Sequence, residues 1–241
     1  SVASRGLGDV YKRQVRGRRV SRLGAIELSS TPVRPDPVRA RHVALEAVRS
    51  GGLDVASLTK NGESLRRRLA LAHRVFGDPW PDVSDEALLA RAEEWLDLDA
   101  LAAGRGSDAA SGLRGLLGWR ESARLDEVVP ETITVPSGSR IRIDYPEPGS
   151  DTSPVLAVKL QECFGWTDGP TVCDGRVRVV LHLLSPARRP LAVTDDLASF
   201  WASVYPAVRV ENRGRYSKHP WPEDPMTATP TKRTNRALRG N

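Results

Sequence analysis

Apolar and polar positions alternate most regularly between Val177 and Leu183, where every second residue is apolar. Arg176 precedes this run, Arg178 and His182 fall within it, and Val180 is also apolar. This period of two predicts a strand. The prolines of the segment 185–190 end it, because proline donates no ladder hydrogen bond, and 191–193 resumes as a short strand. Thr194 is placed to cap a helix with Asp195 and Asp196 in its first turn. The apolar stripe of that helix is Leu197, Phe200, Trp201 and Val204.

Upstream, the apolar period is that of helices. Asp36 and Pro37 predict a helix start, and its inward positions are Val38, Ala44, Leu45 and Val48 before Gly51 and Gly52 end it. A second helix has Leu65, Leu69, Ala72 and Phe76 on one face, with Arg66, Arg67 and Arg68 turned away, and ends at Gly77. Trp80 falls in a turn, after which Ser84 caps a third helix whose inward residues are Leu88, Leu89, Ala92, Trp95 and Leu96. Two shorter helical pieces around 113–117 and 121–128 complete this region.

The period changes to two again after Pro130. Ile133 to Tyr145 predicts a hairpin around the turn at 136–138. From Pro154, the spacing of Leu156, Leu160 and Phe164 by four favours a helix, and a strand is the alternative because of Val155 and Val158. The predicted fold class is α+β, with a helical N-terminal region followed by a small mixed β-sheet domain covered by helices.

Four ordered blocks carry a resemblance to a known family. They are VPSGSRIRIDY at 135–145, LAVKLQECFG at 156–165, LHLLSPARRPLAVTDDLASFW at 181–201 and GRYSKHPWPEDP at 214–225. Together they resemble the C-terminal region of the HrpB-type bacterial DEAH-box ATP-dependent helicases, and weaker similarity extends back to about Val15. The resemblance implies a parent with two RecA-like motor domains, which would bind ATP and Mg²⁺, and upstream helicase core domains as partners.

The domain organisation expected from these patterns has five parts. Residues 1–14 are expected to be a non-native leader derived from a sequencing adaptor. Residues 15–35 are expected to be the truncated end of an oligonucleotide-binding-like (OB-like) domain and a linker. Residues 36–129 form the helical subdomain, 130–225 the HrpB-type C-terminal α+β domain, and 226–241 a disordered basic tail.

Composition excludes several classes of protein. The chain has 241 residues, 39% hydrophobic and 27% charged, which is typical of a globular protein. It contains no apolar run of about 18 residues, so no membrane association is predicted. Its two cysteines, Cys163 and Cys173, form no CxxC pair and suggest a reducing, cytoplasmic location. The net charge of +6 comes from the two ends, since residues 1–41 carry +7 and residues 209–241 carry +5.

Catalytic machinery is not expected in this fragment, which therefore needs no cofactor of its own. No GxxxxGK[ST] phosphate loop occurs. The run Asp85-Glu86-Ala87-Leu88 is close to a DEAH motor box, but its acidic pair opens a helix after a serine cap, where carboxylates favour the dipole. The four histidines and two cysteines lack metal-ligand spacing. Ser185 has no GxSxG context, and no nucleophile is spaced with a base.

The remaining candidate chemistry is nucleic-acid binding. Cations interleaved with aromatic residues suit a single strand of RNA, because cations contact phosphates and aromatic rings stack on bases. The candidate residues are Arg140, Arg142, Arg188, Arg189, Arg213, Arg215, Tyr216, Lys218, His219 and Trp221. The alternative is that Tyr216 and Trp221 pack this segment onto the sheet while the cations are only solvated, which leaves a protein-docking or structural domain.

Overall fold

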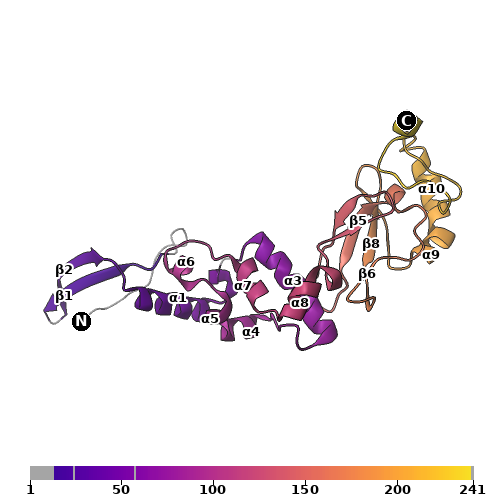
Figure 1. Ribbon diagram of the computed structural model, residues 1–241. Helices are drawn as coiled ribbons and strands as arrows, with labels where there is room; N and C mark the ends of the chain where they lie inside the picture. The colour runs from indigo at the N-terminus through magenta and orange to yellow at the C-terminus, as the bar shows by residue number, and fades with distance from the viewer. Residues whose placement is uncertain (1–13, 24, 57, 240–241) are drawn as a thin grey trace. The chain divides into compact units, whose positions relative to one another are not determined.

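The computed structural model describes residues 14–23, 25–56 and 58–239 (Figure 1). The chain divides into two compact units, Ser1–Ser122 and Ala123–Asn241. The expected leader at 1–14 lies outside the described residues except for Gln14. No described helix is both long enough and apolar enough to cross a membrane.

The first unit begins with a two-stranded antiparallel sheet. Strand β1 (Gly17–Leu23) pairs with β2 (Ile26–Val33), and the register shifts between Ser21 and Arg22. The described residues supply no further strand to this sheet. That the hairpin comes from an oligonucleotide-binding-type barrel stays a prediction.

The rest of the first unit is helical. Its helices are α1 (Pro37–Gly51), α2 (Leu53–Ala56), α3 (Lys60–Phe76), α4 (Asp85–Ala90), α5 (Ala92–Trp95), α6 (Leu98–Ala102) and α7 (Ala109–Gly115), and α8 (Trp119–Val128) begins here. The two predicted N-caps are confirmed, since the Asp36 carboxylate accepts a hydrogen bond from the Arg39 amide and the Ser84 hydroxyl from the Ala87 amide. The turn at Trp80 is confirmed as well, and the structure adds that Trp80 is buried.

Three details of the helical prediction are wrong. Val38 is exposed, because it lies on the outer side of the first turn of α1. Arg68 is fully buried, because α3 packs against α7 and its buried face is wider than one stripe. The predicted third helix is broken at Arg91 into α4 and α5, where the Trp95 indole N–H donates to the carbonyl of Leu88 at 2.9 Å.

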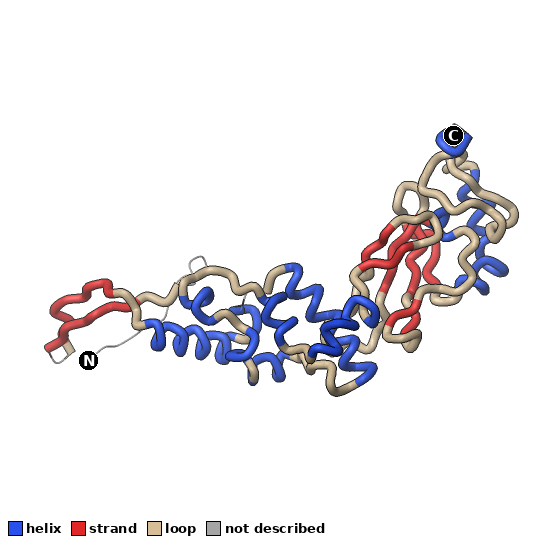
Figure 2. Tube along the Cα trace, viewed as in Figure 1, coloured by secondary structure: helices blue, strands red, loops and turns tan. Residues whose placement is uncertain are grey.

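The second unit contains three small sheets (Figures 1 and 2). The predicted hairpin is confirmed as β3 (Thr132–Thr134) and β4 (Arg140–Arg142). The central sheet has the order β5 (Val155–Lys159), β8 (Val180–Leu184) and β9 (Pro190–Thr194), with β5 parallel and β9 antiparallel to β8. A third pair, β6 (Thr171–Val172) and β7 (Val177–Arg178), lies in the connection between β5 and β8. These mixed sheets and the helices confirm the α+β class.

Two strand predictions need correction. The helix expected from Pro154 is instead strand β5 followed by the 3₁₀ helix η1 (Leu160–Cys163), so the alternative strand prediction is confirmed for 155–159. Burial alternates along β5, and the two β-branched valines suit a strand. The strand expected over 177–183 is two strands in different sheets, because β7 pairs with β6 while β8 pairs with β5 and β9.

The C-terminal helical segment lies along one side of these strands (Figure 2). It consists of α9 (Leu197–Ser199), the π-helical turn η2 (Phe200–Val204) and α10 (Tyr205–Arg213). Its cap is Asp196, which accepts from the Ser199 amide at 2.9 Å, and not Thr194 as predicted. The π-helical turn has more residues per turn than an α-helix, so the buried face that begins at Leu197 continues to Tyr205. Val204 is therefore 44% exposed instead of buried.

The segment after Met226 differs from the expected disordered tail. The Thr231 amide donates to the carbonyl of Gln161 at 2.8 Å, and Thr231 is buried. A last short helix, α11 (Asn235–Arg239), follows. A segment without an apolar period is therefore ordered here by backbone hydrogen bonds rather than by a buried stripe.

Candidate nucleic-acid interface

The aromatic residues of the segment Arg213–Trp221 serve mainly to fix its path. Trp221 is 9% exposed, and its indole N–H donates to the carbonyl of Tyr216 at 3.2 Å. The Arg209 side chain donates to the Trp221 carbonyl, and the Tyr205 hydroxyl donates to the Pro222 carbonyl, both at 2.8 Å. These contacts favour the packing interpretation for Trp221, whereas Tyr216 is only half-buried.

The cations of the same segment are exposed. Arg213 ends α10, and Arg215 and Lys218 follow it on the surface. Within the described part of the chain, none of these three side chains forms an ion pair. Buried Asn212 supports the segment, because its side-chain amide donates to the Val208 carbonyl and its own carbonyl accepts from the Tyr216 amide, both at 2.9 Å. A hydrogen-bonded segment therefore carries these unpaired positive charges.

A second group of cations lies at one end of the central sheet. Lys159 ends β5 and is paired in register with Leu184 at the end of β8. The turn that follows Leu184 carries Arg188 and Arg189, both exposed, so these residues lie at the same end of the sheet as Lys159. Buried Ser185 holds the turn, since its hydroxyl accepts from the Arg189 amide at 3.1 Å. Arg188 has a φ of 61°, a left-handed conformation that is uncommon for arginine.

The hairpin β3–β4 brings Arg140 toward the same end. Asp144, after β4, forms an antiparallel bridge with Val155 at the start of β5. On the other side of Arg140, the Ser137 amide donates to the carbonyl of Glu162, and its hydroxyl donates to the Glu162 carboxylate at 2.8 Å. Between these two anchors, the register places Arg140 level with Lys159. Its guanidinium donates to the Thr132 hydroxyl, and the Arg140 side chain is exposed.

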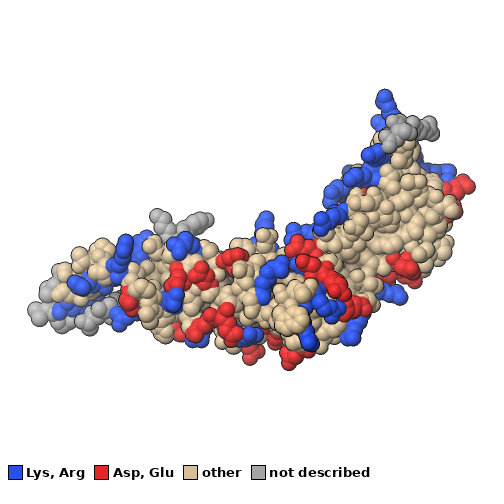
Figure 3. Space-filling model, in the orientation of Figure 1, with Lys and Arg blue, Asp and Glu red and all other residues tan. Residues whose placement is uncertain are grey.

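His219 connects the two groups of cations electrostatically. Partial burial, and then the positive charge of nearby Lys159, lower the pKa of His219 below its ordinary value. We call the group around Lys159 the basic end of the sheet, and it consists of Arg140, Lys159, Arg188, Arg189, Lys218 and His219; Arg213 and Arg215 lie in the neighbouring part of the Arg213–Trp221 segment. Figure 3 shows Lys and Arg side chains along the edge of this unit that leads to the C-terminal helix.

The structure thus places the predicted candidates in different settings. Arg140, Arg188, Arg189, Lys218 and His219 come together at the basic end, whereas Trp221 is buried in the packing of the segment. Sequence reasoning missed Lys159, which it assigned to a helix. The strand pattern of Val155 and Val158 is the signal that could have identified Lys159. A strand over these residues would place Lys159 at its end, where it could join Arg188 of the following turn.

The remaining motifs, among the described residues, do not form a motor box, a metal site or a reactive thiol. Asp85 opens α4 and forms an ion pair with Arg66, so the Asp85-Glu86 pair stands at an exposed helix start. Among the described residues, no three His, Cys, Asp or Glu side chains are grouped as a metal site. Cys163 and Cys173 are free and buried, and burial raises the pKa of the Cys163 thiol, which disfavours the reactive thiolate.

The family model described as ATP-dependent helicase C-terminal, HrpB_C, matches residues 92–225, which include the three sheets of the second unit, α9, α10 and the Arg213–Trp221 segment. The chain belongs to this family. All four sequence blocks that carried the resemblance lie inside the matched residues, so the predicted family is confirmed.

Relatives of the HrpB_C chain support the assignment. It is 42% identical over 221 residues to the ATP-dependent RNA helicase HrpB of Escherichia coli K12, which covers 89% of this chain and 27% of that protein. A crystal structure of the E. coli DExH-box NTPase HrpB superposes with a TM-score of 0.76 at 42% identity, over 90% of this chain and 28% of that one. A crystal structure of the E. coli DEAH/RHA helicase HrpB superposes with a TM-score of 0.64 at 40% identity, over 85% of this chain and 26% of that chain. The HrpB_C chain therefore spans about a quarter of the length of these relatives.

Proposed function

We propose that this chain is the accessory C-terminal part of an ATP-dependent RNA helicase and that it contributes contacts to single-stranded RNA. The relative named as an ATP-dependent RNA helicase supports the parent activity. In this proposal, the motor domains of the parent bind ATP and Mg²⁺, while this chain lacks a phosphate loop and is inactive alone. The parent acts in the cytoplasm, and its core domains are the partners of this chain.

The observation that carries the proposal is the gathering of cations at the basic end. Like charges repel, so exposed cations on separate elements are usually dispersed or paired with carboxylates. Here Lys218, Arg188 and Arg189 have no ion pair among the residues that the structure describes. The carboxylate of Glu162, three residues after Lys159, is buried and bonded to Ser137. A chain of phosphates would supply the missing negative charge, and the half-buried ring of Tyr216 offers a stacking face for a base.

The test is a fluorescence titration of a labelled single-stranded oligonucleotide at several salt concentrations. Replacing Arg213, Arg215 and Lys218 by Ala should weaken binding and flatten the dependence of log affinity on log salt by about two units if all three contact phosphates of a flexible single strand. Tyr216→Ala should instead cost about 1 to 3 kcal/mol of stacking and leave the slope nearly unchanged.

A matched control removes the same charge elsewhere. Arg39, Arg105 and Arg114 are exposed in the helical unit, so their triple Ala variant loses three positive charges without touching the candidate interface. It should bind almost as the wild type does. If wild-type affinity is no better than that of a neutral control protein, RNA binding is wrong and a protein-docking domain is the better conclusion.

A further inference from the structure

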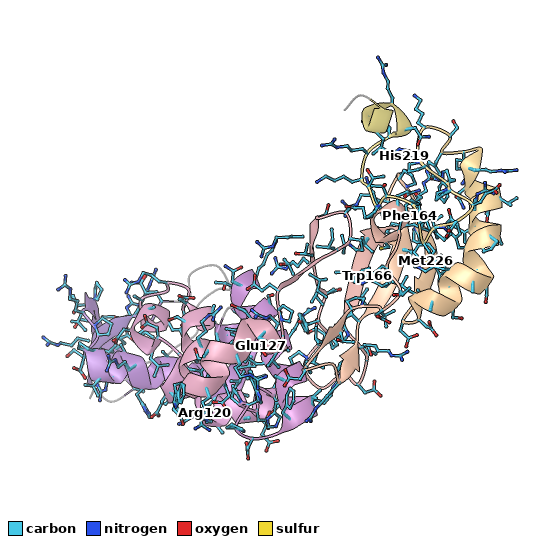
Figure 4. All side chains as sticks on the ribbon, turned by 45° about the vertical axis from the view of Figure 1, so that its right-hand side comes forward. Arg120, Glu127, Phe164, Trp166, His219 and Met226 are labelled. Carbon is cyan, nitrogen blue, oxygen red and sulfur yellow. The ribbon has the colours of Figure 1, made fainter. Side chains whose placement is uncertain are left out.

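The last described segment of the chain is fastened to the same face as the candidate interface. The Gly165 amide donates to the Pro225 carbonyl at 3.0 Å, and the Thr231 amide donates to the Gln161 carbonyl at 2.8 Å. The chain therefore runs back over η1, and Figure 4 shows Met226 close to Phe164 and Trp166. Because η1 directly follows Lys159, this path leads toward the basic end.

The segment then joins the residues beside His219. The Asn235 amide donates to the Lys218 carbonyl at 2.8 Å, and its side-chain amide donates to the Ser217 carbonyl at 3.4 Å. Thr231 is buried, and its hydroxyl accepts from the Arg233 amide at 2.9 Å. The segment is therefore held at Thr231 by Gln161 and at Asn235 by Lys218.

This placement adds positive charge to a surface that is already basic. Lys232, Arg233 and Arg236 are exposed, and none of them forms an ion pair within the described ranges. No Asp or Glu occurs after Asp224, so the segment carries no compensating charge of its own. Backbone hydrogen bonds hold these cations beside Lys218 although their mutual repulsion opposes it, and a bound anion would relieve that repulsion.

We infer that the C-terminal segment 231–238 is part of the same binding site, where Lys232, Arg233 and Arg236 contact further phosphates of the strand that Lys218 contacts. The inference rests on the proposed function. Lys232 and Arg233 lie on the bend before α11 and Arg236 lies in the first turn of α11, so with Lys218 the segment presents several exposed cations, which suits the several phosphates of a strand. The partner is therefore a nucleic-acid strand longer than the contacts of the Arg213–Trp221 segment alone would need.

Two variants of the full 241-residue chain test this inference, with a fluorescein-labelled 20-nucleotide oligouridylate as the probe. The triple variant Lys232→Ala, Arg233→Ala and Arg236→Ala should weaken binding and flatten the salt slope by about two units. Asn235→Pro removes the amide that anchors the segment to Lys218 but keeps every charge, and proline is tolerated in the first turn of a helix. Asn235→Pro should weaken oligonucleotide binding severalfold, because the segment 231–238 is then no longer held beside Lys218.

The controls separate the two levels of the proposal. The Arg39, Arg105 and Arg114 triple variant has the same net charge as the C-terminal triple and should leave the slope unchanged. A slope unchanged in the C-terminal triple, together with a slope flattened by loss of Arg213, Arg215 and Lys218, would overturn the inference and keep the proposed function. A wild type that does not bind the probe would overturn both. Circular dichroism and protection of the two buried cysteines check that each variant remains folded.

Discussion

Replacing Trp201 by Ala should strongly destabilise the second unit. Trp201 is 6% exposed, and its ring centroid lies 5.1 Å from that of Phe200, 5.3 Å from that of Tyr205 and 6.1 Å from that of Phe164. Emptying a buried aromatic site costs about 3 to 5 kcal/mol of the free energy of unfolding. The lost hydrogen bond from the indole N–H to the Trp166 carbonyl, 2.8 Å long, adds about 1 kcal/mol or less, because half-buried Trp166 remains accessible to water.

The assay uses the only two cysteines of the chain. Cys163 and Cys173 are both fully buried in the second unit, so their reaction with a thiol reagent reports unfolding of that unit and not of the helical one. With a slope of about 1.5 kcal/mol per molar urea, the predicted loss lowers the midpoint of thiol exposure by roughly 2 to 4 M.

The matched control is Trp119→Ala, because Trp119 is 78% exposed and its loss should leave the midpoint nearly unchanged. Trp201→Phe keeps an aromatic ring, so its urea midpoint should lie between those of the wild type and Trp201→Ala. Coincident midpoints for wild type and Trp201→Ala would refute the packing of α9, η2 and α10 described above.

Three further outcomes are expected. Asp196→Ala removes the observed helix cap and should cost about 1 kcal/mol in the thiol assay, whereas Asp195→Ala should cost much less; equal effects would contradict the cap. The folded chain holds the pKa of His219 below the unfolded value of about 6.5. The contribution of His219 to stability is therefore present above that value and is lost as pH falls through the lower folded pKa. When the pH is lowered from about 7.5 to about 5.5, the urea midpoint of the wild type should decrease relative to that of His219→Gln. The purified chain should release no phosphate from ATP with Mg²⁺ above background, and release that depends on Mg²⁺ would contradict the absence of a motor.

Much of the fold follows from local patterns in the sequence. The caps at Asp36 and Ser84 depend on one side chain and an amide three residues later, so they can be predicted without tertiary structure. The hairpin at 132–142 likewise depends on its own alternation and turn. Family membership was also accessible, because its four blocks are contiguous in sequence.

The errors arise where tertiary contacts decide. Spacing by four from Leu156 to Phe164 resembles a helix, but β5 gains its hydrogen bonds from β8, which is distant in sequence. The π-turn at Phe200–Val204 moves burial to Tyr205, and no local propensity marks such a turn. The burial of Arg68 and the docking of Thr231 depend on elements that periodicity does not bring together.

The candidate site was predictable as a list of residues but not as a surface. The sequence identified Arg140, Arg188 and Lys218 on three separate elements. The register of the strands brings Arg140 and Arg188 to the end of the sheet at Lys159, and the effect of Lys159 on His219 places the neighbouring Lys218 there. Trp221 stayed ambiguous because an aromatic ring between cations suits both stacking and packing, and its indole hydrogen bond favours packing.

Photocrosslinking tests the proposed RNA surface most directly. A single-stranded oligonucleotide containing 4-thiouridine is bound to the 241-residue chain, irradiated, and the attached peptides are mapped by mass spectrometry. Crosslinks are expected in the Arg213–Trp221 segment, around Lys159 and Arg188, and in 231–238, and all of them should decrease in the Arg213, Arg215 and Lys218 triple variant. Crosslinks confined to the β1–β2 hairpin, or unchanged in that variant, would contradict an RNA-binding surface at the basic end.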